Sequence, residues 1–497
     1  MPPHRKATIR RFRISNDVLL SILEYLDPPS LWRACKAFRR IHSLAMEYQS
    51  LRYKYELAVS GMKDGPVAYS KAPPISRLRL LLSYRKDWLE LAWTHEHRLH
   101  IPLPAQVGIS GGFFHQVHNH GPFSTLELSE LPSSRSNRPP ALTRHLKFTT
   151  SLIDCVAVDL VQVLIVTGRI FSHQGQIDIQ LLFRDLWSFA KHPRARTLTY
   201  EFSIPATVST SIIRQALLVC GSKVAVSLEF SNGRIRHLIL NWWNFDARWL
   251  DDQDIQFLDE TYLLGAGTRS GSAIVSLYNV SKVASISVVR EFELPATWSN
   301  TIVKFLPNSS TRSDVSQPSD ALFYAAPETR VLAISSTPTA ISHSEYYPMN
   351  WLFLKEAYFR FPSRRDGFRV SWRQWGQYCL IREIDMQPSA IRGPCVVGTK
   401  VFYVENATTH SSRSHTNNSR SSRLRVIDLS SFVEPAESSR GWTSVGPRAN
   451  LFPIESRRSI PTPSVDGVLV KDVNATEDNI VLFLVYVHNS AVGSRLT

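Results

Sequence analysis

The stretch QALLVCGSKVAVSLEFSNGRIRHLILNWWNF, residues 215–245, alternates apolar runs with short groups of turn residues. Its runs are rich in Val, Ile and Leu and end on aromatic residues, and β-branched and aromatic side chains suit the half-buried surface of a pleated sheet. Ser231-Asn232-Gly233 separates two of the runs, and a polar cluster with glycine is typical of a tight turn. The stretch therefore predicts consecutive short strands joined by turns.

Similar runs recur from about Thr149 to the end of the chain, where helical periodicity is nearly absent. Examples are IDCVAVDLVQVLIVTGR at 153–169, CVVGTKVFYVEN at 395–406 and NIVLFLVYVHN at 479–489. Many short strands over about 350 residues are typical of a β-propeller, because radial repetition leaves few exposed edges. At about 45 residues per blade, we predict a β-propeller-like domain of about seven blades over residues 149–497. No strand closes on a Trp-Asp pair, so a large sandwich or an irregular β-structure is the alternative.

The N-terminal part of the chain, from Asn16 to about Trp93, has helical periodicity instead. Its first apolar residues recur on one face of a helix, namely Val18, Leu19, Ile22, Leu23 and Leu26. Asp27-Pro28-Pro29 predicts the end of this helix and the start of a second, because proline lacks an N–H donor and disfavours helix in the residue before it. We predict a helical domain over residues 10–60 and a helical and loop connector over 61–148, which makes the chain a multidomain protein with α and all-β parts.

Residues 14–40, ISNDVLLSILEYLDPPSLWRACKAFRR, resemble an F-box. Ile14-Ser15 stands where that family has Leu-Pro, and Asp17 stands where it usually has Glu. In the family, this helical hairpin packs against a Skp1-type adaptor that links it to a cullin-RING ubiquitin ligase. The resemblance implies a set of adaptor-binding residues, which are Ile14, Val18, Leu19, Ile22, Leu23, Leu26, Pro28 and Leu31.

The whole chain resembles, more loosely, fungal F-box proteins of mushroom-forming species, in which a helical segment and a β-rich, propeller-like part follow the F-box. The resemblance implies a substrate-recognition subunit of an SCF-type E3 ubiquitin ligase. Such a subunit binds a protein substrate, is a monomer within its complex, and works in the cytoplasm, the nucleus or both. Periodicity alone leaves a second interpretation open, in which the apolar face of the hairpin is only core and the chain is a propeller scaffold without a ligase link.

Composition adds a third functional class and argues against others. The net charge of +15 is compatible with a nucleic-acid partner, although the basic residues are spread along the chain. The five cysteines are odd in number and have no C-x-x-C spacing, so we expect neither a disulfide framework nor a cysteine zinc site, and a reducing compartment fits best. We find no apolar run long enough for a transmembrane helix and no secretory signal at the basic N-terminus.

Few residues suggest catalysis, and we expect no active site, cofactor or metal. Phosphate-binding, dinucleotide-binding, nucleophile-elbow and zinc-protease motifs are missing from the sequence. Asp154 and Asp159 lie in one strand-like run and are five residues apart, so they should face opposite ways. The histidine-rich segment has no cysteine or carboxylate cluster to complete a metal site; its residues are His95, His97, His100, His115, His118 and His120.

Two aromatic pairs remain as candidates for recognition. Trp242-Trp243 and the pair Trp372 and Trp375 lie in strand-like runs beside arginines. Trp and Arg dominate binding hot spots when they are exposed, and they can also stack bases. When buried, the same residues are ordinary sheet packing, so the sequence leaves core, partner surface and nucleic-acid surface open.

Overall fold

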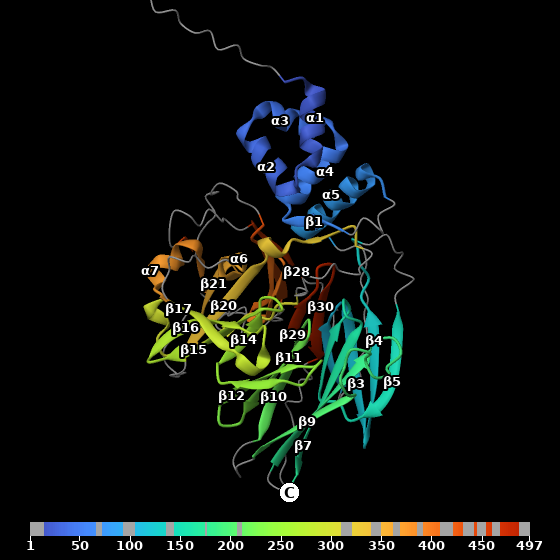
Figure 1. Cartoon of the computed structure of the whole chain (residues 1–497), viewed down its shortest axis with the longest axis vertical. Helices are drawn as coiled ribbons and strands as arrows, with labels where there is room; N and C mark the ends of the chain where they lie inside the picture. The colour runs from blue at the N-terminus through green and yellow to red at the C-terminus, as the bar shows by residue number, and fades with distance from the viewer. Residues whose placement is uncertain are drawn as a thin grey trace, which may run out of the picture.

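A computed structural model gives the fold, with the N-terminal helices of residues 16–90 gathered on one side of a larger strand-rich body (Figure 1). The structure describes residues 14–65, 72–92, 105–135, 144–173, 176–205, 211–309, 321–338, 349–360, 368–384, 391–407, 421–430, 442–444, 454–459 and 468–486. The polar segments 310–320 and 408–420 lie outside the described residues, as do His95, His97 and His100. None of the described helices has the length and apolar character needed to cross a membrane.

Four short helices form the N-terminal unit: α1 (Asn16–Tyr25), α2 (Pro28–Ala37), α3 (Arg39–Glu47) and α4 (Gln49–Val59). The Ser15 hydroxyl accepts the Val18 N–H at 3.4 Å and starts α1, and the Asp27 carboxylate accepts the Ser30 N–H at 3.1 Å and starts α2. These are ordinary N-cap contacts, which satisfy backbone donors that a helix leaves free at its start. The predicted hairpin and its hinge are therefore correct. The core of the unit consists of Leu23, Leu31, Cys35, Ala45 and Leu51.

A longer helix and a short strand connect this unit to the rest of the chain. Strand β1 (Met62–Asp64) follows α4, and α5 (Pro74–Glu90) packs along α4. Gly61 precedes β1 with a φ of +64°, a left-handed conformation that glycine adopts without a Cβ penalty. Strand β1 pairs antiparallel with β19 (Phe323–Ala325), which comes from the middle of the strand-rich body. The helical part and the body thus share a two-stranded sheet.

The body consists of six antiparallel sheets of four or five strands among the described residues. Each of the first three sheets is a simple meander in chain order. Sheet 1 holds β2 (Ala105–Ser110), β3 (Phe113–His120), β4 (Phe123–Glu130) and β5 (His145–Ser151). Sheet 2 holds β6 (Cys155–Asp159), β7 (Leu164–His173), β8 (Gln176–Asp185) and β9 (Thr199–Pro205). Sheet 3 holds β10 (Ile212–Cys220), β11 (Lys223–Phe230), β12 (Ile235–Asn241) and β13 (Ala247–Leu250).

Sheets 4 and 5 have an extra strand each, and short helices lie between strands of sheet 5. Sheet 4 holds β14 (Asp254–Phe257), β15 (Tyr262–Arg269), β16 (Ser272–Asn279), β17 (Ser287–Glu293) and the parallel addition β22 (Arg369–Val370). Sheet 5 holds β18 (Thr301–Phe305), β20 (Val331–Pro338), β21 (Met349–Lys355), β23 (Leu380–Ile384) and β27 (Trp442–Ser444), with α6 (Ala357–Arg360) and α7 (Trp372–Trp375) between β21 and β23. Sheet 6 holds β24 (Ile391–Val397), β25 (Lys400–Ala407), β26 (Ser421–Asp428) and β28 (Ile454–Ser459).

Consecutive sheets pack face to face around a ring, which is a β-propeller. A separate apolar cluster joins each pair of neighbours: sheets 1 and 2, 2 and 3, 3 and 4, 4 and 5, and 5 and 6. The hairpin of β29 (Val468–Ala475) and β30 (Ile480–Tyr486) packs on sheet 6 and reaches sheet 1, where Phe483 stacks on Phe114 at 6.5 Å between ring centroids. The prediction of a propeller-like domain is confirmed, and the sandwich alternative is wrong.

Two details of the prediction change. The propeller has six blades rather than about seven, since six sheets have four or five strands each. The hairpin β29–β30 has only two strands and fills the gap between sheets 6 and 1. Strands also begin at Ala105, so the segment 61–148 contains most of sheet 1 as well as α5. About half of the residues in β3 (FFHQVHNH) and β4 (FSTLELSE) are polar. Their sequences therefore indicate strands less clearly than the more apolar runs that follow. All five cysteines are free.

Candidate interaction surfaces

Helix α1 has one buried and one exposed apolar face. Leu23 points into the core of the helical unit and is 2% exposed. The opposite face carries Val18 and Ile22, which are 52% and 49% exposed, and Ile14, which is 47% exposed, lies just before the helix begins at Asn16. Val18 and Ile22 are four residues apart and lie in a row along the helix, and Tyr25 extends the row. We call Ile14, Val18, Ile22 and Tyr25 the α1 stripe.

The predicted adaptor-binding residues therefore divide into three groups. Ile14, Val18 and Ile22 are exposed, whereas Leu23 and Leu31 are buried in the core of the helical unit. The remaining residues are half-buried, and they are Leu19, Leu26 and Pro28. Tyr25 was not among the predicted residues, although it lies three positions after Ile22 on the same face. The structure thus brings only part of the predicted set to one accessible surface.

Two basic side chains hold the ends of α1 in place. The Arg40 guanidinium donates to the Ile14 carbonyl at 2.7 Å and to the Asn16 side chain at 2.5 Å. The Lys54 ammonium donates to the carbonyls of Glu24 at 2.5 Å and Leu26 at 3.3 Å. A cation near the C-terminal carbonyls of a helix also interacts favourably with the helix dipole. The α1 stripe is therefore presented by a helix that is fixed at both ends.

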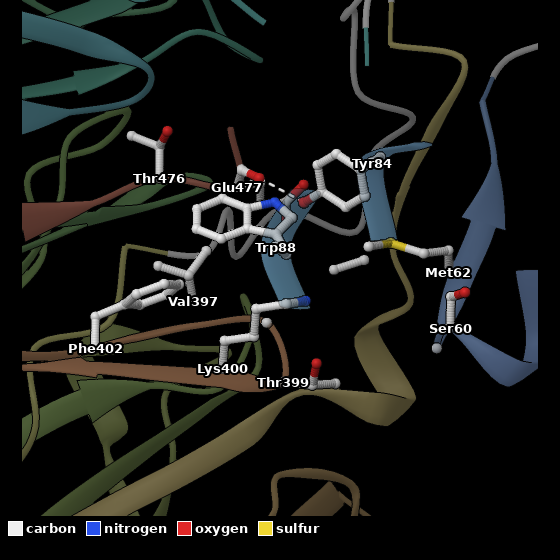
Figure 2. Close-up of a pocket in the computed structure, with 13 residues that line it drawn as sticks. Ser60, Met62, Tyr84, Trp88, Val397, Thr399, Lys400, Phe402, Thr476 and Glu477 are labelled. Carbon is white, nitrogen blue, oxygen red and sulfur yellow. Dashed lines mark hydrogen bonds between the residues drawn. The ribbon is translucent and has the colours of Figure 1, made fainter. Parts of the chain in front are cut away.

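Helix α5 attaches the helical unit to the propeller through aromatic contacts. The Trp88 ring packs against Phe402 at 5.3 Å between centroids, and Tyr84 packs against Phe323 at 5.5 Å. The Tyr84 hydroxyl donates to the Glu477 carbonyl at 2.5 Å (Figure 2). A cavity of about 10 Å³ in this joint has room for about one water molecule, so it is not a small-molecule site.

An ion-pair network lies beside the same joint. Arg135, in the loop after β4, donates to the Asp478 carboxylate at 3.0 and 2.8 Å and to the Glu477 carboxylate. Arg135 also donates to the Phe323 carbonyl at 3.3 Å. Burial alone would raise the pKa of Asp478, but the Arg135 charge and its hydrogen bonds outweigh burial and hold that pKa below its usual value. The network joins sheet 1, the β29–β30 turn and β19.

The aromatic pairs are mostly core. Trp242 is fully buried and donates its indole N–H to the Gly221 carbonyl at 3.0 Å, and Trp375 is fully buried and donates to the Glu293 carbonyl at 2.6 Å. Trp372 packs edge-on against Trp375 at 5.1 Å. Trp243 differs, because it is 42% exposed. Of these four residues, only Trp243 is an exposed recognition candidate.

The candidate carboxylates have structural partners, and the three described histidines of the predicted segment lie in β3. His118 and His120 stack at 6.3 Å on one face of β3, and burial lowers the pKa of His115 to about 4. The described residues contain no group of three or more potential metal ligands. Asp154 accepts the Ile170 N–H at 2.6 Å and Asp159 accepts the Val161 N–H at 2.9 Å, so both carboxylates stabilise local backbone.

Asp254 gives a test of pH-dependent stability. Its carboxylate accepts N–H groups of Phe305 at 2.8 Å and Ile255 at 2.9 Å, but burial dominates and raises its pKa from 3.8 to about 6. A raised folded-state pKa contributes stability that is present at low pH and lost as pH rises through about 6. Because asparagine does not titrate, the stability of Asp254→Asn relative to wild type should rise by up to about 3 kcal/mol between pH 4 and pH 7. Urea unfolding at the two pH values measures this difference, and an unchanged difference would contradict the assignment.

Comparisons with known proteins give weak structural likeness. Neither a protein-family model nor a curated protein matches the chain. The WD40 domain of SCAP from fission yeast is similar at 10% identity and a TM-score of 0.35, over 66% of this chain and 72% of that one. An uncharacterised protein of Listeria monocytogenes is similar at 6% identity and a TM-score of 0.38, over 81% of this chain and all of that one. The WD40 domain of Toxoplasma gondii coronin is similar at 10% identity and a TM-score of 0.31, over 65% and 66% of the two chains. The assignment of a six-bladed propeller rests on the order and packing of the sheets.

Proposed function

We propose that the chain is a protein-interaction scaffold that acts as the substrate-recognition subunit of an SCF-type ubiquitin ligase. In this proposal the helical unit binds a Skp1-type adaptor, and the propeller binds a protein substrate. The chain then contributes no active site of its own. The observation that carries the proposal is the α1 stripe, an exposed apolar row on a helix whose opposite face already packs in a core.

Apolar surface that stays exposed to water is unfavourable, and a partner that covers it gains stability. Burial of apolar area stabilises an interface by about 25 cal/mol per Å². Apolar residues at helical spacing are the usual anchors when a helix lies in a partner's groove. The choice of a Skp1-type adaptor comes from the resemblance to an F-box, which includes the Asp27-Pro28 hinge and Leu31 at the start of α2.

The adaptor interaction can be tested with variants that leave the core intact. Val18→Asp with Ile22→Asp places two charges on the α1 stripe, and we expect recovery of a recombinant fungal Skp1-type adaptor in a pull-down to fall by at least about tenfold. Ile213→Asp is a matched control, since Ile213 is 62% exposed on sheet 3, and its recovery of adaptor should equal wild type. Leu23→Asp is unsuitable, because it places a charge in the core.

The outcomes separate the proposal from its rival. Binding that survives the double substitution would contradict docking through the α1 stripe. Failure of the wild-type chain to bind the adaptor would favour a propeller scaffold without a ligase link. Unchanged circular dichroism and thermal midpoint in the double variant are needed for either conclusion, and we expect both because Val18 and Ile22 are surface residues.

A further inference from the structure

A second exposed surface combines basic residues with the exposed tryptophan. The loop between β8 and β9 carries Lys191, Arg194 and Arg196, and the turn between β12 and β13 carries Trp243. All four are exposed. The Arg194 guanidinium lies over the Trp243 ring at 5.6 Å, and Arg196 donates to the Asn244 carbonyl at 3.2 Å, so the loop and the turn are in contact. We call these four residues the Trp243 patch.

The Trp243 patch lies on the same face of the propeller as the helical unit. In an antiparallel blade, the turns after the first and the third strand emerge on the same side. Helix α5 lines the small cavity together with Gly398, which lies in such a turn of sheet 6, and β1 pairs with β19, which lies between the first and second strands of sheet 5. The β8–β9 loop and the β12–β13 turn follow the third strands of sheets 2 and 3. The Trp243 patch therefore lies on this face, and its four side chains are exposed there.

The positive charges of the Trp243 patch are not neutralised by neighbours. Lys191, Arg194 and Arg196 form no ion pair with any residue that the structure describes. The nearby carboxylates accept hydrogen bonds within their own turns. Asp185 accepts the N–H groups of Trp187 and Ser188 at 3.0 and 2.8 Å, and Asp246 accepts from the Asn244 side chain at 2.8 Å. Three unpaired cations on one exposed surface attract an anionic partner.

We propose that the Trp243 patch binds an acidic peptide segment of a partner protein. Arg194 and Arg196 would pair with carboxylates, for which the guanidinium geometry is well suited, and the exposed part of Trp243 would cover an apolar side chain of the same segment. The proposal extends the proposed function, since it gives the substrate that the propeller holds an acidic character. It also stands on different residues from the α1 stripe.

An acidic peptide fits these observations better than a nucleic acid does. Single-stranded nucleic acids stack successive bases on open aromatic faces. Here Arg194 already covers one face of Trp243, and Trp242 meets the ring edge-on at 5.9 Å and 78°. Trp243 is also the single exposed ring of the patch. A short stretch of carboxylates needs only the guanidinium groups and one apolar contact.

The direct test measures binding of a labelled peptide to the full chain. The probe is a fluorescein-labelled octapeptide of Glu and Leu, with a Gln and Leu peptide of the same pattern for comparison. We expect fluorescence anisotropy to detect the Glu peptide only, and Arg194→Glu with Arg196→Glu to weaken binding by at least about tenfold. Trp243→Ala should weaken it by about fivefold.

A matched control separates a local contact from a general charge effect. Arg423→Glu with Arg457→Glu makes the same change of net charge on exposed residues of sheet 6, and affinity for the Glu peptide should change by less than about twofold. Equal loss in both double variants, no binding of the Glu peptide, or equal binding of the Gln peptide would overturn the proposal. The proposal would also be overturned, in favour of a nucleic acid, if an oligothymidine bound more tightly than the Glu peptide and the Arg194 and Arg196 changes abolished that binding. The adaptor pull-down uses other variants, so either proposal can fail while the other stands.

Discussion

Trp242→Ala should lower the free energy of unfolding of the propeller by about 3–5 kcal/mol, the range for truncation of a large buried aromatic residue. Trp242 is fully buried between sheets 2 and 3. Its ring stacks on the Phe183 ring at 5.9 Å between centroids and packs edge-on against the His192 ring at 4.9 Å between centroids. The substitution also removes the donor to the Gly221 carbonyl, which adds about 1 kcal/mol when that acceptor stays buried.

The neighbouring residue is a natural control for this prediction. Trp243→Ala removes the same side chain one position later, where the ring is 42% exposed, and should cost less than about 1 kcal/mol. Thermal unfolding followed by tryptophan fluorescence and circular dichroism compares the two variants. Similar thermal midpoints for Trp242→Ala and Trp243→Ala would contradict the conclusion that Trp242 stabilises the packing of sheet 2 against sheet 3.

The helical hairpin could be predicted from sequence because local chemistry determines its boundaries. Ser15 and Asp27 cap helices with contacts that span three residues, and Pro28 occupies the first turn of α2. Which apolar residues are buried could not be predicted in the same way. Both faces of α1 are apolar, and only the packing of α3 and α4 against one of them leaves Leu23 inside and Val18 outside.

The predicted number of blades was too high because it was derived from chain length, and part of that length forms no blade of its own. Sheet 5 extends from β18 to β27, and this part of the chain includes α6, α7 and β22, a strand that belongs to sheet 4. An average blade length counts those insertions as an extra blade. The Trp243 patch was also beyond sequence reasoning, because Arg194 and Trp243 come from different sheets and are brought together only by the packing of the ring.

Arg135→Met should cost about 3–5 kcal/mol, because removal of one partner from a buried ion pair leaves uncompensated charge. Arg135 is 8% exposed, and its loss would leave the carboxylates of Asp478 and Glu477 without their cation. The depressed pKa of Asp478 means that this contribution is present at neutral pH and is lost as pH falls through the acidic range. The stability difference between wild type and Arg135→Met should therefore shrink in acid.

The effect should be greatest where the helical unit meets the propeller. Arg135 bonds the Phe323 carbonyl, and Phe323 belongs to the strand that pairs with β1, so hydrogen exchange of the β1 and β19 amides should accelerate in Arg135→Met. Arg144→Met is a matched control, since Arg144 is half exposed and lies 4.0 Å from Glu130, and it should cost less than about 1 kcal/mol. Adding Glu477→Gln and Asp478→Asn to Arg135→Met should recover part of the lost stability, because neutral side chains need no buried cation. If Arg135→Met cost no more than Arg144→Met and left exchange at β1 unchanged, the Arg135 network would not stabilise the attachment of the helical unit to the propeller.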